Sequence, residues 1–294
     1  MTVTPNAARE RLVGWICAGL LLLVWTGFHL VSRFIVRDGL TPWDVAMLRY
    51  AGAFVCVLPL LAWHGLPRIA PRRVPAVLVF AGFGFPLGAY AGYQLAPAAH
   101  GATVMAAGLP AVTALLATAC GMGRITARRL AGLGIITMGS VLLAWTTSGA
   151  WEGAWRGDLL FLAAVSSWAV YTLLVQRWAL PALDTTIALG LAAAPVFLPV
   201  WFFLLPSGMA GASWTVILTQ AAFHGAGASV IAGILYTRSV AALGPAATTM
   251  IGAAVPALVA ITAWPLLGEV LSPVAILAVL LVSGGMLVGM GRAR

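Results

Sequence analysis

The polar side chains inside the long apolar runs of this chain suit the binding of a small solute rather than covalent chemistry. Trp25, His29 and Arg33 follow one another at intervals of four, so they share one face of a helix. Ionisable residues at membrane depth are costly, and they are functional candidates by default. Aromatic rings with a few hydrogen-bonding groups are the usual lining of a small-molecule site.

Later apolar runs carry further residues of the same kinds. We expect a substrate cavity lined by Trp25, His29, Arg33, Tyr90, Tyr93, Gln94, His100, Trp168, Tyr171, Gln220 and His224. Each also has a plainer interpretation: tryptophan and tyrosine as interfacial residues, histidine bonded between helices, and Arg33 extended to the membrane surface. Arg49 is interpreted as a structural partner of Asp44 or of a backbone carbonyl.

Catalytic and metal-binding patterns are missing from the sequence. There is no His-Glu-x-x-His, no Gly-x-Ser-x-Gly and no pair of aspartates, and the absence of lysine excludes a phosphate-binding glycine loop that ends in lysine. Cys17, Cys56 and Cys120 lie in separate apolar runs, which predicts neither a metal site nor a disulfide framework. We therefore predict that the chain is not an enzyme and that it has no cofactor and no metal.

The elements that must position these residues are membrane-spanning helices. Hydrophobic residues make up 62% of the 294 residues and charged residues 8%, with a mean hydropathy of +1.03. A span needs about 20 apolar residues. The first run follows Arg9 and Arg11 like a secretory signal, but it has a counterpart later in the chain, so we expect it to be retained. The pattern predicts an all-α integral membrane protein with ten spans, at approximately 12–35, 43–63, 75–95, 98–120, 127–147, 157–178, 184–205, 214–237, 243–267 and 270–290.

The chain contains an internal repeat of about half its length. Residues 90–116 and 236–262 correspond at a shift of 146, which places Tyr90 on Tyr236 and Pro110 on Pro256. Trp25 and Trp168 also match at a slightly smaller shift. Because each half has five spans, an odd number, the halves 1–149 and 150–294 must cross the membrane in opposite directions around a central cavity.

Prolines and aspartates recur at matching places in the two halves. Pro110 and Pro256 interrupt their spans, either as hinges or as kinks that only shape the cavity. Asp44 and Asp184 begin their spans, where a carboxylate complements the helix dipole, so we interpret them as helix caps.

The positive charge of the chain reports orientation. All sixteen basic residues are arginine, and the net charge is +9. If the N-terminus lies inside, twelve arginines gather on the inner side, only Arg37 and Arg156 lie outside, and Arg33 and Arg49 fall within spans. This bias predicts two cytoplasmic termini. No basic face with polar surroundings exists, so nucleic-acid binding is not expected.

The arrangement resembles the EamA branch of the drug/metabolite transporter superfamily. The resemblance rests on the two five-span halves, on Leu48-Arg49-Tyr50, and on the second-half stretch from Pro256 to Leu267-Gly268-Glu269. It weakens at residues 121–124, where Gly-Met-Gly-Arg replaces the Gly-Glu that the family often has. The chain is also similar to the YddG-like branch of amino-acid exporters. The resemblance implies a cavity walled by spans 1, 3, 4, 6, 8 and 9 that opens alternately to either side.

These observations together lead to an expected function. All seven acidic residues lie at span ends or in loops, so the usual carboxylate for ion coupling is missing. We expect a secondary transporter of the bacterial inner membrane that exports small amphipathic metabolites, such as neutral or aromatic amino acids. Uniport is one mechanism that fits the missing carboxylate. The transporter's expected partners are a small-molecule substrate and the lipid bilayer, and we expect a monomer or weak dimer. Alternatives are a sugar-phosphate, nucleotide-type or multidrug carrier of the same fold, or a proton-coupled antiporter that uses histidine.

Overall fold

The computed structural model describes residues 5–37, 39–96, 98–145, 153, 155–267 and 272–290. Helices form nearly all of this part of the chain. The first half contains α1 (Pro5–Arg37), α2 (Pro42–His64), η1 (Pro71–Arg73), α3 (Val74–Val77), η2 (Leu78–Gly84), α4 (Phe85–Leu95), α5 (Ala98–Ala119) and α6 (Ala127–Trp145). The second half contains α7 (Trp155–Trp178), α8 (Ala182–Leu204), η3 (Met209–Gly211), α9 (Trp214–Gln220), η4 (Ala221–Ile231), α10 (Ala232–Leu243), α11 (Pro245–Ile251), η5 (Gly252–Ala254), α12 (Val255–Leu267) and α13 (Pro273–Met290).

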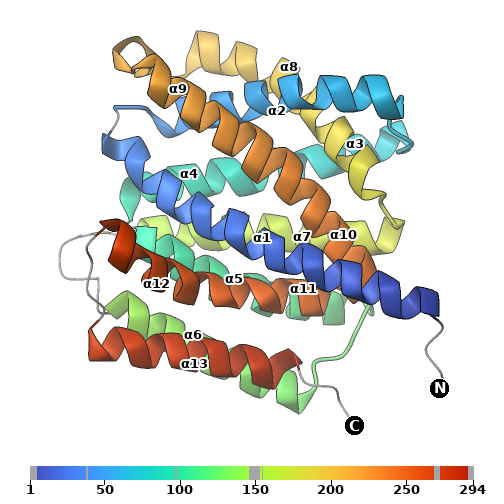
Figure 1. Ribbon diagram of the computed structural model, residues 1–294, viewed down its shortest axis with the longest axis vertical. Helices are drawn as coiled ribbons and strands as arrows, with labels where there is room; N and C mark the ends of the chain where they lie inside the picture. Colours follow the sequence, from blue (N-terminus) through green and yellow to red (C-terminus); the bar gives the residue numbers. More distant parts are fainter. Residues whose placement is uncertain are drawn as a thin grey trace.

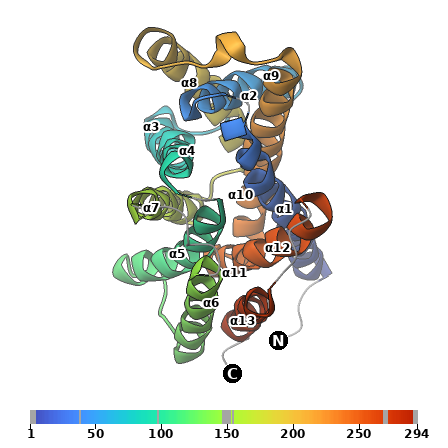
Figure 2. The same ribbon diagram turned by 90° about the vertical axis from the view of Figure 1, so that its left-hand side faces the viewer.

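The helices form two facing rows that are closed at both ends (Figure 1). Figure 2 shows α4, α7 and α5 in one row and α10, α1 and α12 in the other. The pair α2 and α8, with α9, closes one end of the rows, and the pair α6 and α13 closes the other. The two rows and the two end pairs surround a central space, and the candidate site lies there.

Each range expected to span the membrane falls on a helical stretch. Seven helices among the described residues are long and apolar enough to cross a membrane, which is consistent with a membrane protein. Two shorter apolar helices occupy Pro245–Val259 and Ile276–Gly289. The count of ten spans stays a prediction.

Two helices contain π-helical segments, and these occupy matching places. The segment η2 precedes α4, and η4 precedes α10. At the shift of 146 seen in the sequence, η2 falls inside η4. A π-helical segment widens the backbone ladder and changes which carbonyls are available to neighbours, so such segments are frequent at functional sites.

Glycines allow α2 to pack closely against η4. A Cβ added to Gly52 would lie 2.5 Å from the carbonyl oxygen of Ala221, and one added to Gly225 would lie 2.6 Å from the Cα of Gly52. Small residues that let two backbones approach are the usual means of helix association in membranes. The short distance between α2 and η4 brings the side chain of Arg49 within reach of the η4 backbone.

The buried carboxylate of Asp44 joins α2 to the end of α8. Within its own helix start it accepts bonds from the backbone nitrogen and hydroxyl of Thr41, at 2.8 and 2.9 Å, in a capping box. From the second half it accepts bonds from Trp201 Nε1 at 2.9 Å, Ser207 Oγ at 2.7 Å and the Gly208 nitrogen at 2.8 Å. The predicted helix cap is confirmed, and it also connects the two halves. We call this set the Asp44 clasp.

Asp184 makes the corresponding connection at the other end of the α2–α8 pair. It lies in the first turn of α8 and accepts a 2.6 Å bond from the backbone nitrogen of Arg68. His64 Nε2, at the end of α2, lies 3.3 Å from the same carboxylate. Because each aspartate reaches the loop that follows the facing helix, α2 and α8 run antiparallel and are fastened at both ends. We call this second set the Asp184 clasp.

We expect Asp44→Ala to lower the stability of the folded protein by roughly 3 kcal/mol. The substitution leaves several partly buried donors without an acceptor, and each such donor costs about 1–3 kcal/mol. Asp184→Ala is the matched control, and its effect should be smaller because that carboxylate has fewer partners. The measurement is the unfolding temperature of the two detergent-purified variants. Equal losses for both would show that the Asp44 clasp is not the stronger fastening.

Candidate functional site

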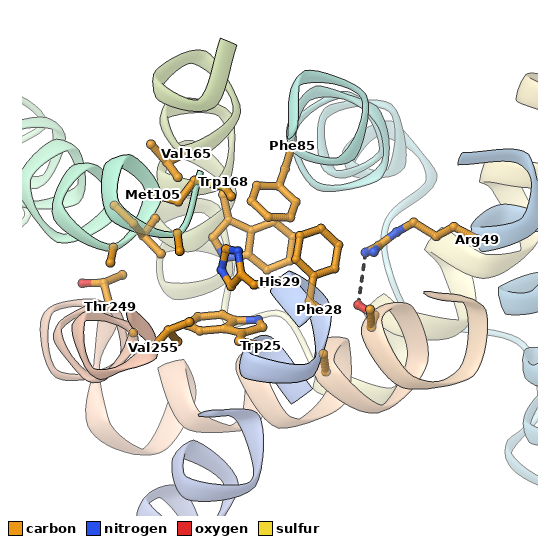
Figure 3. A pocket seen from close by; sticks show the side chains of 16 residues that line it. Trp25, Phe28, His29, Arg49, Phe85, Met105, Val165, Trp168, Thr249 and Val255 are labelled. Carbon is orange, nitrogen blue, oxygen red and sulfur yellow. Dashed lines mark hydrogen bonds between the residues drawn. The ribbon is translucent and has the colours of Figure 1, made fainter. Parts of the chain in front are cut away.

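A chamber with a volume of about 60 Å³ lies between the two rows of helices (Figure 3). Its walls come from α1, α4, α5, α7, η4, α10, α11, η5 and α12, and α2 contributes one residue, Arg49. The residues that face it are largely aromatic or small and apolar, and the polar ones are His29, Arg49, Thr249 and the indole nitrogens of Trp25 and Trp168. We call it the aromatic chamber.

Rings from both halves meet in the wall of the aromatic chamber. Trp168 on α7 lies 4.9 Å from Phe85 and 5.0 Å from Tyr236, measured between ring centroids. Trp25 on α1 lies 5.7 Å from Tyr236 on the other side. Figure 3 shows the ring of His29 between the two tryptophans. Trp25 and Trp168, which match in the sequence, thus both pack against Tyr236 and both line the aromatic chamber.

A second chamber of about 50 Å³ adjoins the first. It lies among α2, η2, α7, α8 and η4, and its polar lining includes Tyr50, Thr186 and Ser229. Three residues, Arg49, Trp168 and Ala228, line both chambers. Arg49 therefore stands at the boundary between an aromatic space and a more polar one. We call the second space the polar chamber.

Arg49 bonds to a backbone carbonyl and not to Asp44. One terminal nitrogen of its guanidinium donates to the carbonyl oxygen of Ala228 in η4, at 3.1 Å, and the other lies 3.5 Å from Tyr90 Oη. The expected alternatives were Asp44 or a carbonyl, and the structure has the carbonyl. Asp44 is unavailable because the other members of the Asp44 clasp occupy it.

The neighbouring residue on α2 makes an equivalent bond to the other π-helical segment. Tyr50 Oη donates to the carbonyl oxygen of Gly82 in η2, at 2.7 Å. Gly82 and Ala228 are 146 positions apart, the shift that relates the two halves of the sequence. Adjacent residues of α2 are therefore hydrogen-bonded to matching carbonyls of η2 and η4, which fixes α2 between them.

Two histidine–tyrosine pairs lie beside the aromatic chamber. His29 Nδ1 is 2.8 Å from Tyr93 Oη, and His224 Nδ1 is 2.9 Å from Tyr90 Oη. The ring of Phe28 separates the pairs: it lies 5.7 Å from His29 and 5.5 Å from His224. His29 faces the chamber, whereas His224 is fully buried behind it and its Nε2 has no hydrogen-bond partner.

A second tyrosine cluster joins α7 to α10. Tyr171 Oη lies 2.7 Å from Thr237 Oγ1, and Tyr236 Oη is hydrogen-bonded to Thr172 Oγ1. The two tyrosine rings are stacked with centroids 6.2 Å apart. Tyr171 also lines the polar chamber. These bonds satisfy hydroxyl groups that the apolar surroundings would otherwise leave unpaired.

The remaining predicted residues lie elsewhere. Gln94 is exposed at the end of α4 and lines neither chamber, and Gln220 is buried on α9 outside both linings. Tyr90 and Tyr93 are buried and line neither chamber; Tyr93 is hydrogen-bonded to His29, and Tyr90 to His224 and Arg49. The side chains of Arg33 and His100 lie outside the described residues.

The two prolines of the repeat differ in their local structure. The helix α5 continues through Pro110, whereas a short 3₁₀ segment, η5, precedes Pro256 at the start of α12. Pro110 and Thr249 both line a wider cavity of about 250 Å³, and Thr249 also faces the aromatic chamber. This wider cavity lies where α5 ends and α11 begins, so the aromatic chamber is approached from that side.

Several lining residues were missed by the sequence prediction. Phe28, Phe85, Met105 and Thr249 face the aromatic chamber, but in the sequence they are ordinary residues of apolar helices. Arg49 was expected to be a structural partner of Asp44 or of a carbonyl, and it was not among the residues predicted to line the cavity. Only the rarity of an arginine inside a span could have singled it out.

The charges around the chambers are few and unbalanced. Among the residues whose side chains the structure describes, Arg49 is the only permanently charged one in the linings of the aromatic and polar chambers. No group of three or more His, Cys, Asp or Glu side chains that could hold a metal ion occurs in the described part of the chain. The described part of the site is therefore an aromatic space beside one cation, an arrangement suited to binding a small molecule.

Comparison with known proteins assigns the second half to a family. Residues 155–290, somewhat less than half of the chain, match the EamA-like transporter family, which indicates a membrane transporter of the drug/metabolite type. No match is found among curated proteins. A solved structure described as a crystal structure of a protein is similar over 96% of both chains, with a TM-score of 0.73 and 18% identity. At that identity the likeness shows a shared fold.

We expect Gly52→Ala to destabilise the protein by about 1–3 kcal/mol, because the added methyl group overpacks the contact between α2 and η4. Gly134→Ala on α6 is the control: nothing lies within 4 Å of the added Cβ, so only the small gain in helix propensity remains. Unfolding temperatures in detergent check both. An unchanged temperature for Gly52→Ala would mean that the close approach of α2 and η4 is not maintained.

Proposed function

We propose that this protein is a secondary transporter of the bacterial inner membrane that moves small amphipathic metabolites, such as neutral or aromatic amino acids, through its central chambers. The observation that carries the proposal is the aromatic chamber at the centre of an apolar ring of helices, with Arg49 at its edge. Apolar walls with a few directed polar groups are typical of small-molecule sites. The family match in the second half supports a transporter.

The proposed domain organisation is two inverted five-helix repeats, 1–149 and 150–294, in one structural unit. The family match at residues 155–290 falls entirely within the second of these ranges. The matching positions of η2 and η4, and of the carbonyls of Gly82 and Ala228, support the repeat. The reversed placement of the Asp44 and Asp184 clasps at opposite ends of α2 and α8 supports the inversion.

The size of the chambers supports alternating access. A volume of about 60 Å³ is small beside the roughly 300–1,000 Å³ of ordinary ligand sites, so a metabolite enters only if the surrounding helices move. The wider cavity at Thr249 lies toward the membrane side on which α5 ends. The Asp44 clasp joins α2 to α8 on the opposite membrane side. In our orientation the wide end is cytoplasmic, as are both termini, and the fastened end is external. Export then requires the Asp44 clasp to open.

We also propose that the protein is a monomer or weak dimer.

A proton-coupled antiporter is the second candidate, and the buried histidine–tyrosine pairs favour it. His29 faces the aromatic chamber and is hydrogen-bonded to Tyr93, so a proton taken up by the imidazole is sensed directly in the chamber. The uniport and antiport candidates differ in one measurable property, the need for a proton gradient.

The first test is counterflow in proteoliposomes made with the full-length protein. We expect labelled L-phenylalanine and L-leucine to exchange against internal unlabelled amino acid without an imposed proton gradient. Hexose phosphates and a quaternary-ammonium drug serve as alternative substrates. Exchange of hexose phosphate or drug alone would contradict the proposed substrate class, and strict dependence on a proton gradient would replace uniport with the antiport candidate.

The second test asks whether the aromatic chamber holds the substrate. We expect Trp168→Ala to raise the half-saturation concentration for counterflow about tenfold, because burial of a large apolar group contributes about 1.5–3 kcal/mol. Trp214→Ala is the control, since this side chain is exposed on α9, away from both chambers. Equal effects of the two substitutions would place the substrate elsewhere.

A further inference from the structure

Arg49 is a buried cation with no counter-ion among the residues that the structure describes. Its residue is 6% exposed, and it lines both chambers from the middle of α2. Figure 3 shows its side chain extending from α2 toward the chamber, with a bond to the Ala228 carbonyl. Burying a charge costs more than burying a neutral polar group unless an opposite charge is supplied. The buried guanidinium is therefore stabilised if an anion binds beside it.

No carboxylate of the described chain supplies the opposite charge. Asp44 is held by the other members of the Asp44 clasp, Asp184 by Arg68 and His64, and Glu10 by Arg238. Asp158 lies in the first turn of α7 and lines neither chamber. These acidic groups lie at helix ends, whereas Arg49 is in the chamber wall. The bonds that Arg49 does make are to neutral oxygens, those of Ala228 and Tyr90.

The guanidinium also retains unused hydrogen-bond donors. It has five N–H groups in a planar fork, and its two bonds use terminal nitrogens at 3.1 and 3.5 Å. Tyr90 Oη is shared with His224 Nδ1: when it accepts from Arg49, it donates to the histidine. Tyr90 and Ala228 therefore orient the fork without neutralising it, and the free N–H groups lie at the boundary of the two chambers.

We propose that Arg49 binds the carboxylate of the transported solute, with the apolar body of the solute against the rings of the aromatic chamber. This inference rests on the proposed function and names the group by which the substrate is recognised. A guanidinium and a carboxylate form two parallel hydrogen bonds, a geometry that an ammonium ion cannot provide. The bound anion supplies the missing opposite charge and takes up the free donors.

The charge balance selects a carboxylate over a phosphate. Arg49 is the one permanent charge among the described residues of the two linings, and one guanidinium neutralises one negative charge. A phosphate monoester carries about 1.5 to 2 negative charges at neutral pH and would retain uncompensated charge among apolar walls. Cationic amines meet a like charge at Arg49. The inferred class is small monocarboxylates and zwitterions with an apolar side chain.

The test is isothermal titration calorimetry of the detergent-purified full-length protein, which measures binding independently of transport. The probes are 3-phenylpropionate, L-phenylalanine, phenylalanine methyl ester, 2-phenylethylamine and phenyl phosphate. We expect the two carboxylates to bind at least about tenfold more tightly than the ester and the amine, because a bond to a charged group discriminates by that factor or more. Phenyl phosphate should bind more weakly than 3-phenylpropionate.

Variants of Arg49 assign the effect to this residue. Arg49→Gln removes the charge and should abolish the preference for carboxylates. Arg49→Lys keeps the charge without the fork, so it should keep the preference with weaker binding, and it serves if Arg49→Gln does not fold. Arg156→Gln, at an exposed arginine, is the matched control and should bind as the unaltered protein does.

The outcomes separate this inference from the proposed function. The carboxylate-binding inference is overturned if the amine or ester binds as tightly as the carboxylates, if neither carboxylate binds, or if phenyl phosphate binds more tightly than 3-phenylpropionate. It is also overturned if Arg49→Gln keeps the preference for carboxylates or if Arg49→Lys loses it. Carboxylate binding through Arg49 without counterflow would refute transport and leave the binding site standing. Counterflow of solutes that lack a carboxylate would support transport and refute the carboxylate site at Arg49.

Discussion

The structure depends on one constraint: polar groups inside an apolar ring of helices must find their partners within the protein. The adjacent residues Arg49 and Tyr50 illustrate it, since they donate to backbone carbonyls of the two π-helical segments, Ala228 in η4 and Gly82 in η2. These bonds fix α2 between η2 and η4 and make α2 part of the chamber wall. The glycine contact at Gly52 sets the distance over which the Arg49 bond is made.

The same constraint explains the ends of the α2–α8 pair. Asp44 and Asp184 are both buried carboxylates, and each is satisfied by donors from the loop that follows the facing helix. The Asp44 clasp has more donors, and three of them come from α8 and the loop after it, so separating the helices at that end breaks more bonds. The Asp184 clasp includes a histidine and a single strong backbone bond. The two ends of the α2–α8 pair are therefore fastened unequally.

Sequence reasoning predicted the features that depend on pattern and missed those that depend on packing. Helical ranges follow from runs of apolar residues. The match of Tyr90 with Tyr236 in the sequence did not show that both tyrosines are buried; packing against neighbouring helices decides that. The roles of Trp25, His29 and Trp168 as chamber-lining residues followed from helical spacing and from the repeat. Nothing in the sequence marks a π-helical segment, because it arises from strain and packing rather than from residue type.

The position of Arg49 could not be predicted for the same reason. Asp44 lies five residues before Arg49, and on an α-helix this spacing turns two side chains about 140° apart, so the pair does not meet on one face. The carboxylate of Asp44 instead accepts bonds from donors of the second half that are far away in the sequence. Arg49 is directed toward η4, where its partners are neutral oxygens. A cation therefore remains at the boundary of the two chambers.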